Sequence, residues 1–388
     1  MKTPARFREL ILSASDVADV RRAMRARIEE GLAAPDRELK SLPTYLSPPV
    51  PGDRRPALAL DLGGTNLRAA VVEVGGPGPA AVAAGPVEAR IPETWSSPED
   101  FFDWQARVVL SLSPPARIPV GYCFSYPTAV TPERDAVLIR WTKHLRVPGV
   151  EGRAVGKLLE EGLRRRGFDP GAVTVLNDTV AALMGGYVGF SGSGGTFIGL
   201  VIGTGTNLAA IYPTRLLKRR PLLRSFRGEK IAVNLEAGNF HPPHLSSWDE
   251  LLDRASPDPG TQRLEKAVAG AFLPRLFPLV LGEGAPVAEM AEISRRAEED
   301  PSTPEGTAGR LLLERAGDLM AAVVAGTVDS LEKPETAACV LEGSTVNRNP
   351  LYRRRLQSRL ETLLDPCPAL LSLDHSNLIG AAASALAP

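Results

Sequence analysis

The sequence has few of the residues that build cross-linked or metal-held folds. Its 388 residues include only 3 cysteines and 4 histidines. The cysteines, Cys123, Cys339 and Cys367, are odd in number and far apart, so they predict neither a disulfide framework nor a zinc site. The histidines show none of the spacings typical of metal sites. Hydrophobic residues make up 44% of the sequence, which is ordinary for a globular protein. We therefore expect a globular protein.

The chain also lacks net charge and long apolar runs. It has 45 Lys and Arg residues against 45 Asp and Glu residues, so no overall field favours nucleic acid or an anionic membrane. No apolar run is long enough to cross a bilayer, and residues 1–10 are too polar for a signal peptide. We therefore expect a cytoplasmic protein with no nucleic-acid or membrane partner.

Two familiar nucleotide-binding motifs are missing as well. A Walker A loop needs Gly-x-x-x-x-Gly-Lys followed by Ser or Thr and a helix, and the dinucleotide-binding turn also precedes a helix. Here the phrase Gly-Thr-Asn-Leu occurs twice, at residues 64–67 and 205–208, with no lysine and between two strand-forming runs. Each copy therefore predicts a β-hairpin with a glycine-rich tip, at residues 57–75 and 196–212.

The two predicted hairpin tips have the composition of a phosphate site. Glycines allow successive backbone N–H groups to point into one concavity, and threonine hydroxyls add donors without adding charge. Asp61 ends the first strand, where it is well placed to hold waters around a Mg²⁺ ion beside substrate phosphates. Two ordinary tight hairpins are the alternative interpretation, and the similar setting of the two copies weakens it.

Length and pattern predict two α/β domains. At 388 residues the chain is longer than one domain of roughly 150 residues. Besides the hairpins, we expect strands at 118–124, 173–176 and 337–341 and helices at 17–28, 98–112, 152–166, 179–187, 247–254, 260–280, 286–298, 305–331 and 379–386. Ser15 or Asp16 is the expected cap of the first helix, and residues 75–86 are expected to form a loop or hairpin connection. Because the strand–turn–strand order starts again at residue 196, we expect a duplicated α/β unit with a ligand-binding cleft between two lobes.

Asp178 is the best candidate for a catalytic base. It follows a predicted strand and opens a predicted helix, and the carboxyl ends of strands face the crevice of open α/β sheets. Phosphoryl transfer needs positioning, charge neutralisation and a base near the acceptor hydroxyl, and one aspartate at a strand end fits that role. The alternative is that Asp178 is only a helix N-cap, and its position alone does not decide between the two roles.

Several polar residues in turn-like settings are candidates for holding a sugar, whose hydroxyls both donate and accept hydrogen bonds. They are Ser125, Thr142, Lys143, Asn207, Glu236 and Glu265. Each alone is more typical of a surface or capping residue, and composition does not bring them together.

Taken in order, these segments resemble the hexokinase/glucokinase family of ATP-dependent sugar kinases, which has the actin-like ATPase fold. The resemblance covers most of the chain and is carried by residues 60–68, 124–127, 141–143, 149–152, 177–181, 203–207, 234–236, 259–266 and 343–345. It implies a two-lobed, ribonuclease H-like duplicated α/β fold with an interlobe cleft. It also implies an N-terminal helical segment at 1–44, a small lobe at 45–176, a large lobe at 177–374 and a C-terminal helix at 375–388 that returns to the small lobe.

The resemblance also implies a role for each matching residue. Asp178 is then the base for the sugar's 6-hydroxyl, Lys143 is a second catalytic residue, and Asp61 and Asp178 hold Mg²⁺ through water. The hexose is bound by Ser125, Thr142, Lys143, Asn177, Asp178, Asn207, Glu236 and Glu265. ATP and its phosphates are bound by Asp61, Gly63, Gly64, Thr65, Asn66, Arg68, Gly203, Thr204, Gly205, Thr206, Gly343, Ser344 and Thr345.

The resemblance therefore predicts an ATP- and Mg²⁺-dependent hexokinase that converts glucose or a related hexose to its 6-phosphate, the first step of glycolysis. The alternative is a catalytically impaired, hexokinase-like sugar-binding regulator. It is motivated by the family's C-terminal glycine-rich pattern, which is reduced here to Ser376-Asn377-Leu378-Ile379-Gly380. A kinase of the bacterial repressor-related group is disfavoured, since those kinases carry a zinc-binding cysteine cluster and the cysteines here are sparse.

Overall fold

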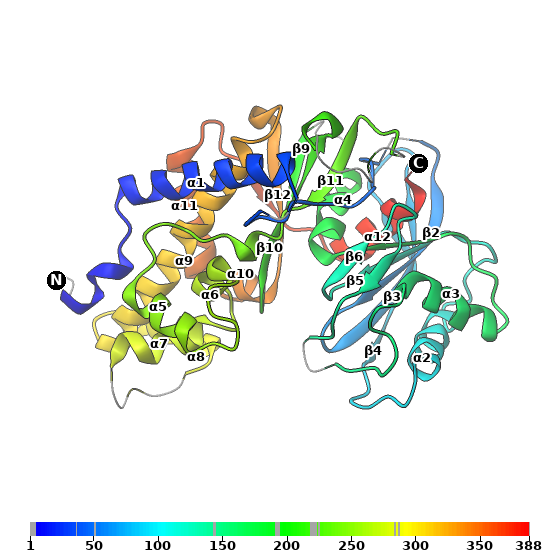
Figure 1. Ribbon diagram of the computed structural model, residues 1–388, viewed down its shortest axis with the longest axis horizontal. Coiled ribbons are helices and arrows are strands. Elements are labelled where there is room, and N and C mark those ends of the chain that lie inside the picture. Colours follow the sequence, from blue (N-terminus) through cyan, green and yellow to red (C-terminus); the bar gives the residue numbers. More distant parts are fainter. Residues whose placement is uncertain are drawn as a thin grey trace. The chain divides into compact units, whose positions relative to one another are not determined.

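The computed structural model describes residues 5–35, 37–49, 52–142, 145–190, 195–217, 223, 226–282, 285 and 288–387. Figure 1 labels most of its helices and strands. The chain forms two compact units, and neither is one continuous segment. Unit 1 comprises Met1–Ser41, Leu200–Leu208 and Leu235–Leu371, and unit 2 comprises Leu42–Gly199, Ala209–Asn234 and Ser372–Pro388.

A five-stranded sheet is the centre of unit 2. Its strand order is β4-β3-β2-β5-β8, in which β2 pairs antiparallel with β3 and parallel with β5. The strands are β2 (Arg55–Leu62), β3 (Asn66–Val74), β4 (Ala81–Arg90), β5 (Val120–Phe124) and β8 (Val173–Leu176). The unit also contains α2 (Pro98–Leu110), α3 (Val155–Arg165), α4 (Asp178–Gly189), α12 (Ser376–Leu386), the strand pair β6 (Thr128–Val130) and β7 (Ala136–Leu138), and the short turn η3 (Thr214–Leu216).

Strand β2 shows why the two faces of this sheet differ. Along residues 57–62 every second residue is leucine, and side chains alternate between the faces of a strand. The leucines join the same apolar cluster as Phe101 of α2. On the other face, α12 comes so close that a side chain at Gly121 would lie 1.9 Å from the backbone oxygen of Ala381. Asp61 is on the face that α12 covers, because it lies between two leucines of the strand.

A second sheet has six strands in the order β1-β11-β10-β9-β12-β13. The strands are β1 (Leu42–Pro43), β9 (Thr196–Ile202), β10 (Thr206–Pro213), β11 (Lys230–Asn234), β12 (Ala337–Glu342) and β13 (Ala369–Leu371). Strand β11 pairs antiparallel with β1 and β10, whereas β12 and β13 pair in parallel. The boundary between the units runs through β9 and β10.

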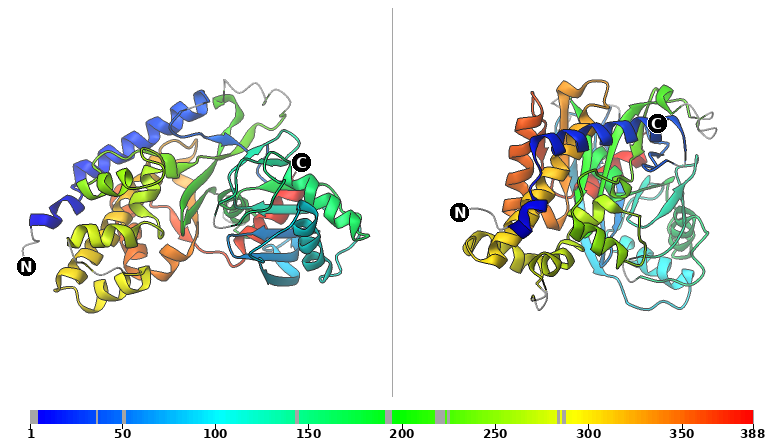
Figure 2. Two further views of the ribbon diagram at one scale, coloured as in Figure 1. Left: turned by 60° about the horizontal axis from the view of Figure 1, so that its bottom comes forward. Right: turned by 60° about the vertical axis from the view of Figure 1, so that its left-hand side comes forward.

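Helix α9 (Pro304–Val328) is the core of unit 1. Every residue from Arg315 to Val328 is buried, and Thr303 caps the helix by accepting a hydrogen bond from the Gly306 N–H. Helices α1, α8 and α11 pack against it, and Figure 2 shows these helices from two further sides. The helices and turns of the unit are η1 (Ala5–Leu10), α1 (Ala14–Ala33), η5 (Ala237–Asn239), α5 (Ser247–Arg254), α6 (Arg263–Val268), α7 (Leu273–Leu281), α8 (Met290–Glu299), η6 (Pro334–Thr336), α10 (Ser344–Arg348) and α11 (Pro350–Leu363).

Both predicted hairpins are confirmed, as are most of the predicted helices, but some caps and element boundaries differ from the prediction. The first helix is capped by Ser13, not by Ser15 or Asp16, because the Ser13 side chain accepts from the Asp16 N–H at 3.1 Å while the Asp16 carboxylate accepts from the Ser13 N–H. The segment at 75–86, predicted as a loop or hairpin connection, does connect antiparallel strands over residues 75–80, but its last residues belong to β4, an edge strand that pairs with β3. The side chains of β4 are exposed or half-buried along its whole length, so its sequence lacks the apolar alternation that predicts a strand.

The predicted helix at 260–280 is also corrected. The segment forms two helices, α6 and α7, which are interrupted at residues 269–272. The N–H groups of Gly270 and Ala271 leave the helical pattern and donate to the backbone oxygens of Gly203 and Thr204, at 2.9 and 3.2 Å. The break therefore results from a long-range contact that a local apolar pattern does not contain.

Two predictions concern the chain as a whole. The lobe boundaries predicted at residues 44, 176 and 374 stay a prediction, because the compact units combine segments from distant parts of the sequence. Among the residues that the structure describes, none of the helices has both the length and the apolar character that a bilayer-spanning segment needs.

Candidate active site

In the first glycine-rich turn, which links β2 to β3 in unit 2, two carbonyl groups accept hydrogen bonds from outside the turn. The Tyr126 hydroxyl donates to the Gly63 oxygen at 2.8 Å, and the Ile91 N–H donates to the Thr65 oxygen at 2.8 Å. Within the described part of the chain, the N–H groups of Gly64 and Thr65 have no hydrogen-bond partner. A turn with engaged carbonyls and unengaged N–H groups is suited to an anion.

The two predicted phosphate-binding residues beyond this turn both contact Glu88 of β4. The Asn66 side-chain amide donates to Glu88 Oε1, and Arg68 Nε donates to Glu88 Oε2 at 3.2 Å. Sequence reasoning missed Glu88, because it lies on the strand whose start had been interpreted as a loop. The cross-strand register that places it opposite Arg68 is not visible in the sequence.

The second glycine-rich turn, between β9 and β10, also combines engaged carbonyls with unengaged N–H groups. The Gly203 oxygen accepts from the Gly270 N–H at 2.9 Å and from the Thr345 hydroxyl at 2.7 Å. Over the described residues, the N–H groups of Thr204 and Gly205 have no hydrogen-bond partner. The duplicated sequence phrase therefore forms two turns of the same kind, one beginning β3 and the other β10.

Three predicted sugar-binding residues gather beside the second turn in unit 1. Glu265 Oε2 accepts a hydrogen bond from the Thr206 N–H at 2.9 Å. Asn207 Oδ1 accepts from the Ala237 N–H at 3.1 Å, and Glu236 directly precedes Ala237 with a left-handed φ of 56°. The structure thus brings Asn207, Glu236 and Glu265 together from three separate segments of the chain.

Two predicted phosphate-binding threonines use their hydroxyls inside unit 1. Thr206 Oγ1 donates to the Val201 oxygen at 3.0 Å, and Thr345 Oγ1 donates to Gly203. Both side chains are buried, with exposed fractions of 4% and 5%. Thr204, by contrast, is exposed at the tip of the turn.

Gly343 packs directly against the second turn. Its φ of 111° lies in the region that favours glycine, and a side chain there would lie 2.4 Å from the Ile202 oxygen. Ser344 begins helix α10 immediately afterwards. The predicted adenosine-binding residues Gly343, Ser344 and Thr345 therefore form one continuous segment against this turn.

Asp61 is a buried carboxylate on the α12 face of the sheet in unit 2. Its exposed fraction is 7%, and among the described residues Oδ1 has no hydrogen-bond partner. The Asn377 amide nitrogen lies 3.5 Å from Oδ2. Burial raises the pKa of Asp61 and the charge of Asp178 raises it further, whereas hydrogen bonds with Cys123 and Asn377 lower it.

Asp178 is the first residue of helix α4, and the cap of that helix is its neighbour. Asn177 Oδ1 accepts from the Thr179 N–H at 2.9 Å, so Asn177 is the N-cap and the interpretation of Asp178 as a cap was wrong. Asp178 Oδ1 accepts from the same N–H at 2.8 Å. Its Oδ2 accepts no hydrogen bond in the part of the chain that the structure describes, and it therefore remains available to an external donor.

The predicted sugar-binding segment of unit 2 is held by aromatic packing. Ser125 directly follows β5 and is 7% exposed. The Trp141 ring lies 5.0 Å from the Tyr126 ring, and its indole N–H donates to the Val147 oxygen at 3.1 Å. Thr142 is half-buried next to this tryptophan, whereas the predicted catalytic residue Lys143 lies outside the described residues.

The donor set around Asp61 suits one kind of cation. The described residues contain no group of three or more His, Cys, Asp or Glu side chains able to enclose a metal. An ion that keeps most of its waters needs only one or two carboxylates, and Mg²⁺ is such an ion. The unpartnered Oδ1 of Asp61 fits a water of that ion.

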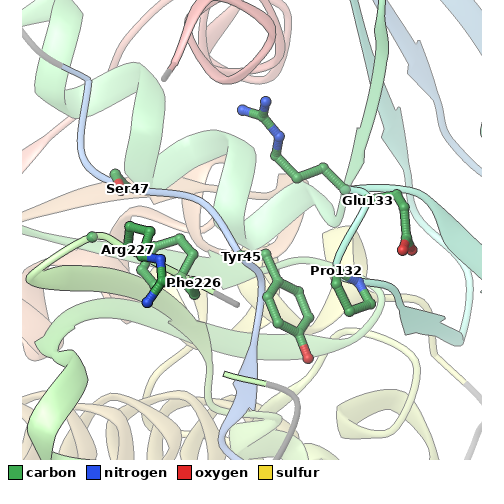
Figure 3. Close-up of a pocket in the computed structure, with 8 residues that line it drawn as sticks. Tyr45, Ser47, Pro132, Glu133, Phe226 and Arg227 are labelled. Atoms are coloured by element: carbon green, nitrogen blue, oxygen red, sulfur yellow. The ribbon is translucent and has the colours of Figure 1, made fainter. Parts of the chain in front are cut away.

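A separate pocket of about 610 Å³ lies in unit 2 and is drawn in Figure 3. It is lined by Tyr45, Ser47, Pro132, Glu133, Arg134, Phe226, Arg227 and Gly228. Its volume is in the range of small-molecule sites, yet none of these lining residues is a predicted site residue. Pocket size alone therefore does not identify the candidate site.

Comparison with known proteins shows two matches to family models, both described as Hexokinase. They cover residues 5–188 and 197–302. Human (Homo sapiens) hexokinase-1 is 33% identical over 287 residues, which cover 70% of this chain and 30% of the relative. Horse (Equus caballus) hexokinase-2 is 27% identical over 417 residues, which cover 92% of this chain and 44% of the relative. The chain thus spans less than half the length of these curated relatives.

Solved structures show the same fold. The hexokinase from Schistosoma mansoni complexed with glucose superposes with a TM-score of 0.81 at 23% identity, covering 98% of this chain and 96% of that chain. The hexokinase of the bacterial repressor-related (ROK) group from Thermus thermophilus gives a TM-score of 0.55 at 19% identity, covering 85% and 97%. The predicted α/β fold of the actin-like ATPase type is confirmed by this likeness.

Proposed function

The chain belongs to the hexokinase family, and on that premise we propose that it is an ATP-dependent hexokinase acting on the 6-hydroxyl of glucose or a related hexose. The observation that carries the proposal is the pair of glycine-rich turns, whose carbonyls are engaged while N–H groups remain unengaged within the described chain. Such turns suit the phosphates of a nucleotide. The similar Schistosoma mansoni protein is complexed with glucose, which makes glucose the first sugar to test.

In this proposal Asp178 accepts the proton of the 6-hydroxyl. Its Oδ1 is held by the Thr179 N–H, which orients the carboxylate, and its Oδ2 is left for the sugar. A base placed within hydrogen-bond reach of the hydroxyl is the main chemical contribution that phosphoryl transfer asks of a side chain. The other residues proposed to hold the hexose are Ser125, Thr142, Lys143, Asn177, Asn207, Glu236 and Glu265.

The phosphates are proposed to contact backbone N–H groups more than charged side chains. The turn residues supply these donors, and Arg68, Lys143 and Thr204 add a charge or a hydroxyl. When bound, Mg²⁺ neutralises charge on the transferring phosphoryl group. Asp61 is proposed to hold the waters of that ion through its unpartnered Oδ1, with Asp178 as the second carboxylate.

The proposal extends to the setting of the enzyme. We propose a cytoplasmic enzyme of glycolysis with no nucleic-acid or membrane partner. A small lobe at 45–176, a large lobe at 177–374 and flanking segments at 1–44 and 375–388 remain the proposed lobe division. The small-molecule partners are the hexose and ATP.

A coupled assay for hexose 6-phosphate, run with a panel of hexoses and ATP, tests the proposal. Asp178→Asn should leave hexose binding intact and reduce kcat about 100-fold or more, as expected for a lost general base. Asp169→Asn is the matched control, because Asp169 is an exposed aspartate of the same unit that pairs with Arg117, and its kcat should be unchanged. Hexose binding without turnover in the wild type would instead support the regulator alternative.

A further inference from the structure

Glu88 is a carboxylate set against the predicted phosphate-binding residues of the first turn. It lies on β4, directly opposite Arg68 in the antiparallel register, while Asn66 stands opposite Arg90. Each carboxylate oxygen of Glu88 accepts from one of the two residues, Oε1 from the Asn66 amide and Oε2 from Arg68 Nε. We call these three residues the Glu88 clasp.

The clasp occupies donors that a phosphate needs. Neither Asn66 nor Arg68 has a second hydrogen-bond partner for its side chain within the described chain. The Arg68 and Glu88 side chains are 48% and 49% exposed. An ion pair of that exposure is weak, so an incoming anion can open it at small cost. When the ion pair opens, the negative charge of Glu88 stays beside the bound anion.

We propose that Glu88 sets the affinity of this protein for polyphosphate ligands by holding Asn66 and Arg68 until the phosphates replace it as acceptor. The inference rests on the proposed function, in which the polyphosphate is that of ATP. A neutral clasp attracts an anion less than Arg68 alone, and the Glu88 carboxylate repels phosphate once the clasp is open. Both effects lower affinity, so removal of the charge should raise it.

Unit 2 contains a matched control pair near the other end of β3. Arg54 Nε lies 3.2 Å from Glu73 Oε2, the same distance as in the Arg68–Glu88 pair, and these side chains are 37% and 45% exposed. Glu73 is seven residues along β3 from Asn66, which places it roughly 23 Å away at the usual rise of a strand. Any general effect of removing a half-exposed carboxylate from this sheet therefore appears in Glu73→Gln as well.

Steady-state kinetics with saturating hexose test the inference. Glu88→Gln should lower KM for ATP about 3- to 10-fold, the scale of one unit charge near a surface site, while KM for the hexose stays unchanged and kcat stays within about twofold. The ratio of wild-type to variant KM should shrink toward one in about 0.5 M salt, because screening shortens the range of the charge. Glu73→Gln should match the wild type. An unchanged or higher KM for ATP in Glu88→Gln overturns the inference.

A binding experiment separates this inference from the proposed function. Inorganic tripolyphosphate, titrated by calorimetry without hexose, should bind Glu88→Gln about 3- to 10-fold more tightly than the wild type. If the wild type phosphorylates no hexose, the proposed function fails, yet this titration still decides about Glu88. Equal affinities of the two proteins, or no tripolyphosphate binding to either, overturn the inference even in an active enzyme.

Discussion

Glu265 of α6 accepts a hydrogen bond of 2.9 Å from the backbone N–H of Thr206, so one side chain holds the beginning of β10 in place. A side chain at Gly205 would lie 2.6 Å from the same carboxylate oxygen. The carboxylate thus fills the space beside the turn that any residue larger than glycine would need. Within unit 1, a proposed sugar-binding residue and a proposed phosphate-binding turn form a single hydrogen-bonded group.

Because of this link, Glu265→Gln is expected to affect both substrates. The hydrogen bond from Thr206 loses its ionic character, and the amide offers donors where the carboxylate offered only acceptors. KM for the hexose should rise about tenfold, and KM for ATP should rise by a smaller factor, as for the loss of a charge-assisted hydrogen bond. Glu292→Gln on the surface of α8 is the control. A normal KM for both substrates would show that the link has no kinetic role.

Asp61→Asn should separate stability from function. Burial raises the pKa of Asp61, so the native state binds this proton more strongly than the unfolded state does. This preference stabilises the native state fully at pH values below the pKa of an unfolded aspartate, about 3.9. The stabilisation is lost as the pH rises through the raised pKa of the native state. At neutral pH the ionised carboxylate therefore costs stability, which the uncharged amide avoids.

We expect Asp61→Asn to melt about 2 °C or more above the wild type at pH 7.5 without Mg²⁺, and this advantage should disappear toward pH 4. Added Mg²⁺ should raise the melting temperature of the wild type and not that of the variant. Thermal unfolding at several pH values, with Asp169→Asn as the control, provides the measurement. Lower stability of Asp61→Asn at pH 7.5 would contradict the assigned direction of the pKa.

The buried ion pair between Arg315 and Asp249 joins α9 to α5 and should matter for stability. Their side chains are 1% and 2% exposed, and Arg315 Nη2 lies 2.5 Å from Asp249 Oδ2. Arg315→Met leaves a buried carboxylate without its partner, which should cost about 3–5 kcal/mol in the free energy of unfolding.

The control for this prediction is Arg310→Met on the same helix. Arg310 pairs with Glu314 one turn away and is 35% exposed, so its loss should cost less than about 1 kcal/mol. Chemical denaturation of both variants provides the comparison. Similar losses of unfolding free energy in the two variants would show that the burial of the Arg315–Asp249 pair does not increase its effect on stability.

The three cysteines should differ sharply in reactivity. Cys123 and Cys339 are buried, and burial raises the pKa of both thiols, that of Cys339 to about 12. Burial also raises the pKa of the Cys367 thiol, but this side chain is only partly buried and a reagent can reach it. A thiol reagent should therefore label Cys367 alone in the native protein and all 3 cysteines in denaturant. Cys367→Ser should abolish the native signal, whereas fast labelling of Cys123 would contradict the burial of that strand.

The features that could be predicted from the sequence are those with a local signal. Glycine-rich tips between strand-forming runs identified both hairpins, because turn chemistry and strand pattern act over a few residues. The end of β8 was also predicted correctly, and the start of α4 within one residue of Asp178. The N-cap of α4 also had a local signal that was missed, because Asn177 is as good an N-cap residue as an aspartate.

Other features that escaped prediction depend on contacts between distant residues. Glu88 meets Arg68 through a strand register, and β4 has no apolar alternation to reveal that register. Glu265 and Thr206 are 59 residues apart, so their hydrogen bond exists only in the folded chain. Sequence pattern suggested which residues take part in the site, and tertiary structure was needed to show what each one contacts.

The path of the chain between the units limits how recombination can exchange parts of the gene. The chain passes from one unit to the other five times, at 41/42, 199/200, 208/209, 234/235 and 371/372. No contiguous stretch of the gene therefore encodes either unit. Recombination with a single crossover therefore cannot exchange the whole of one unit for that of a relative and leave the other unit unchanged.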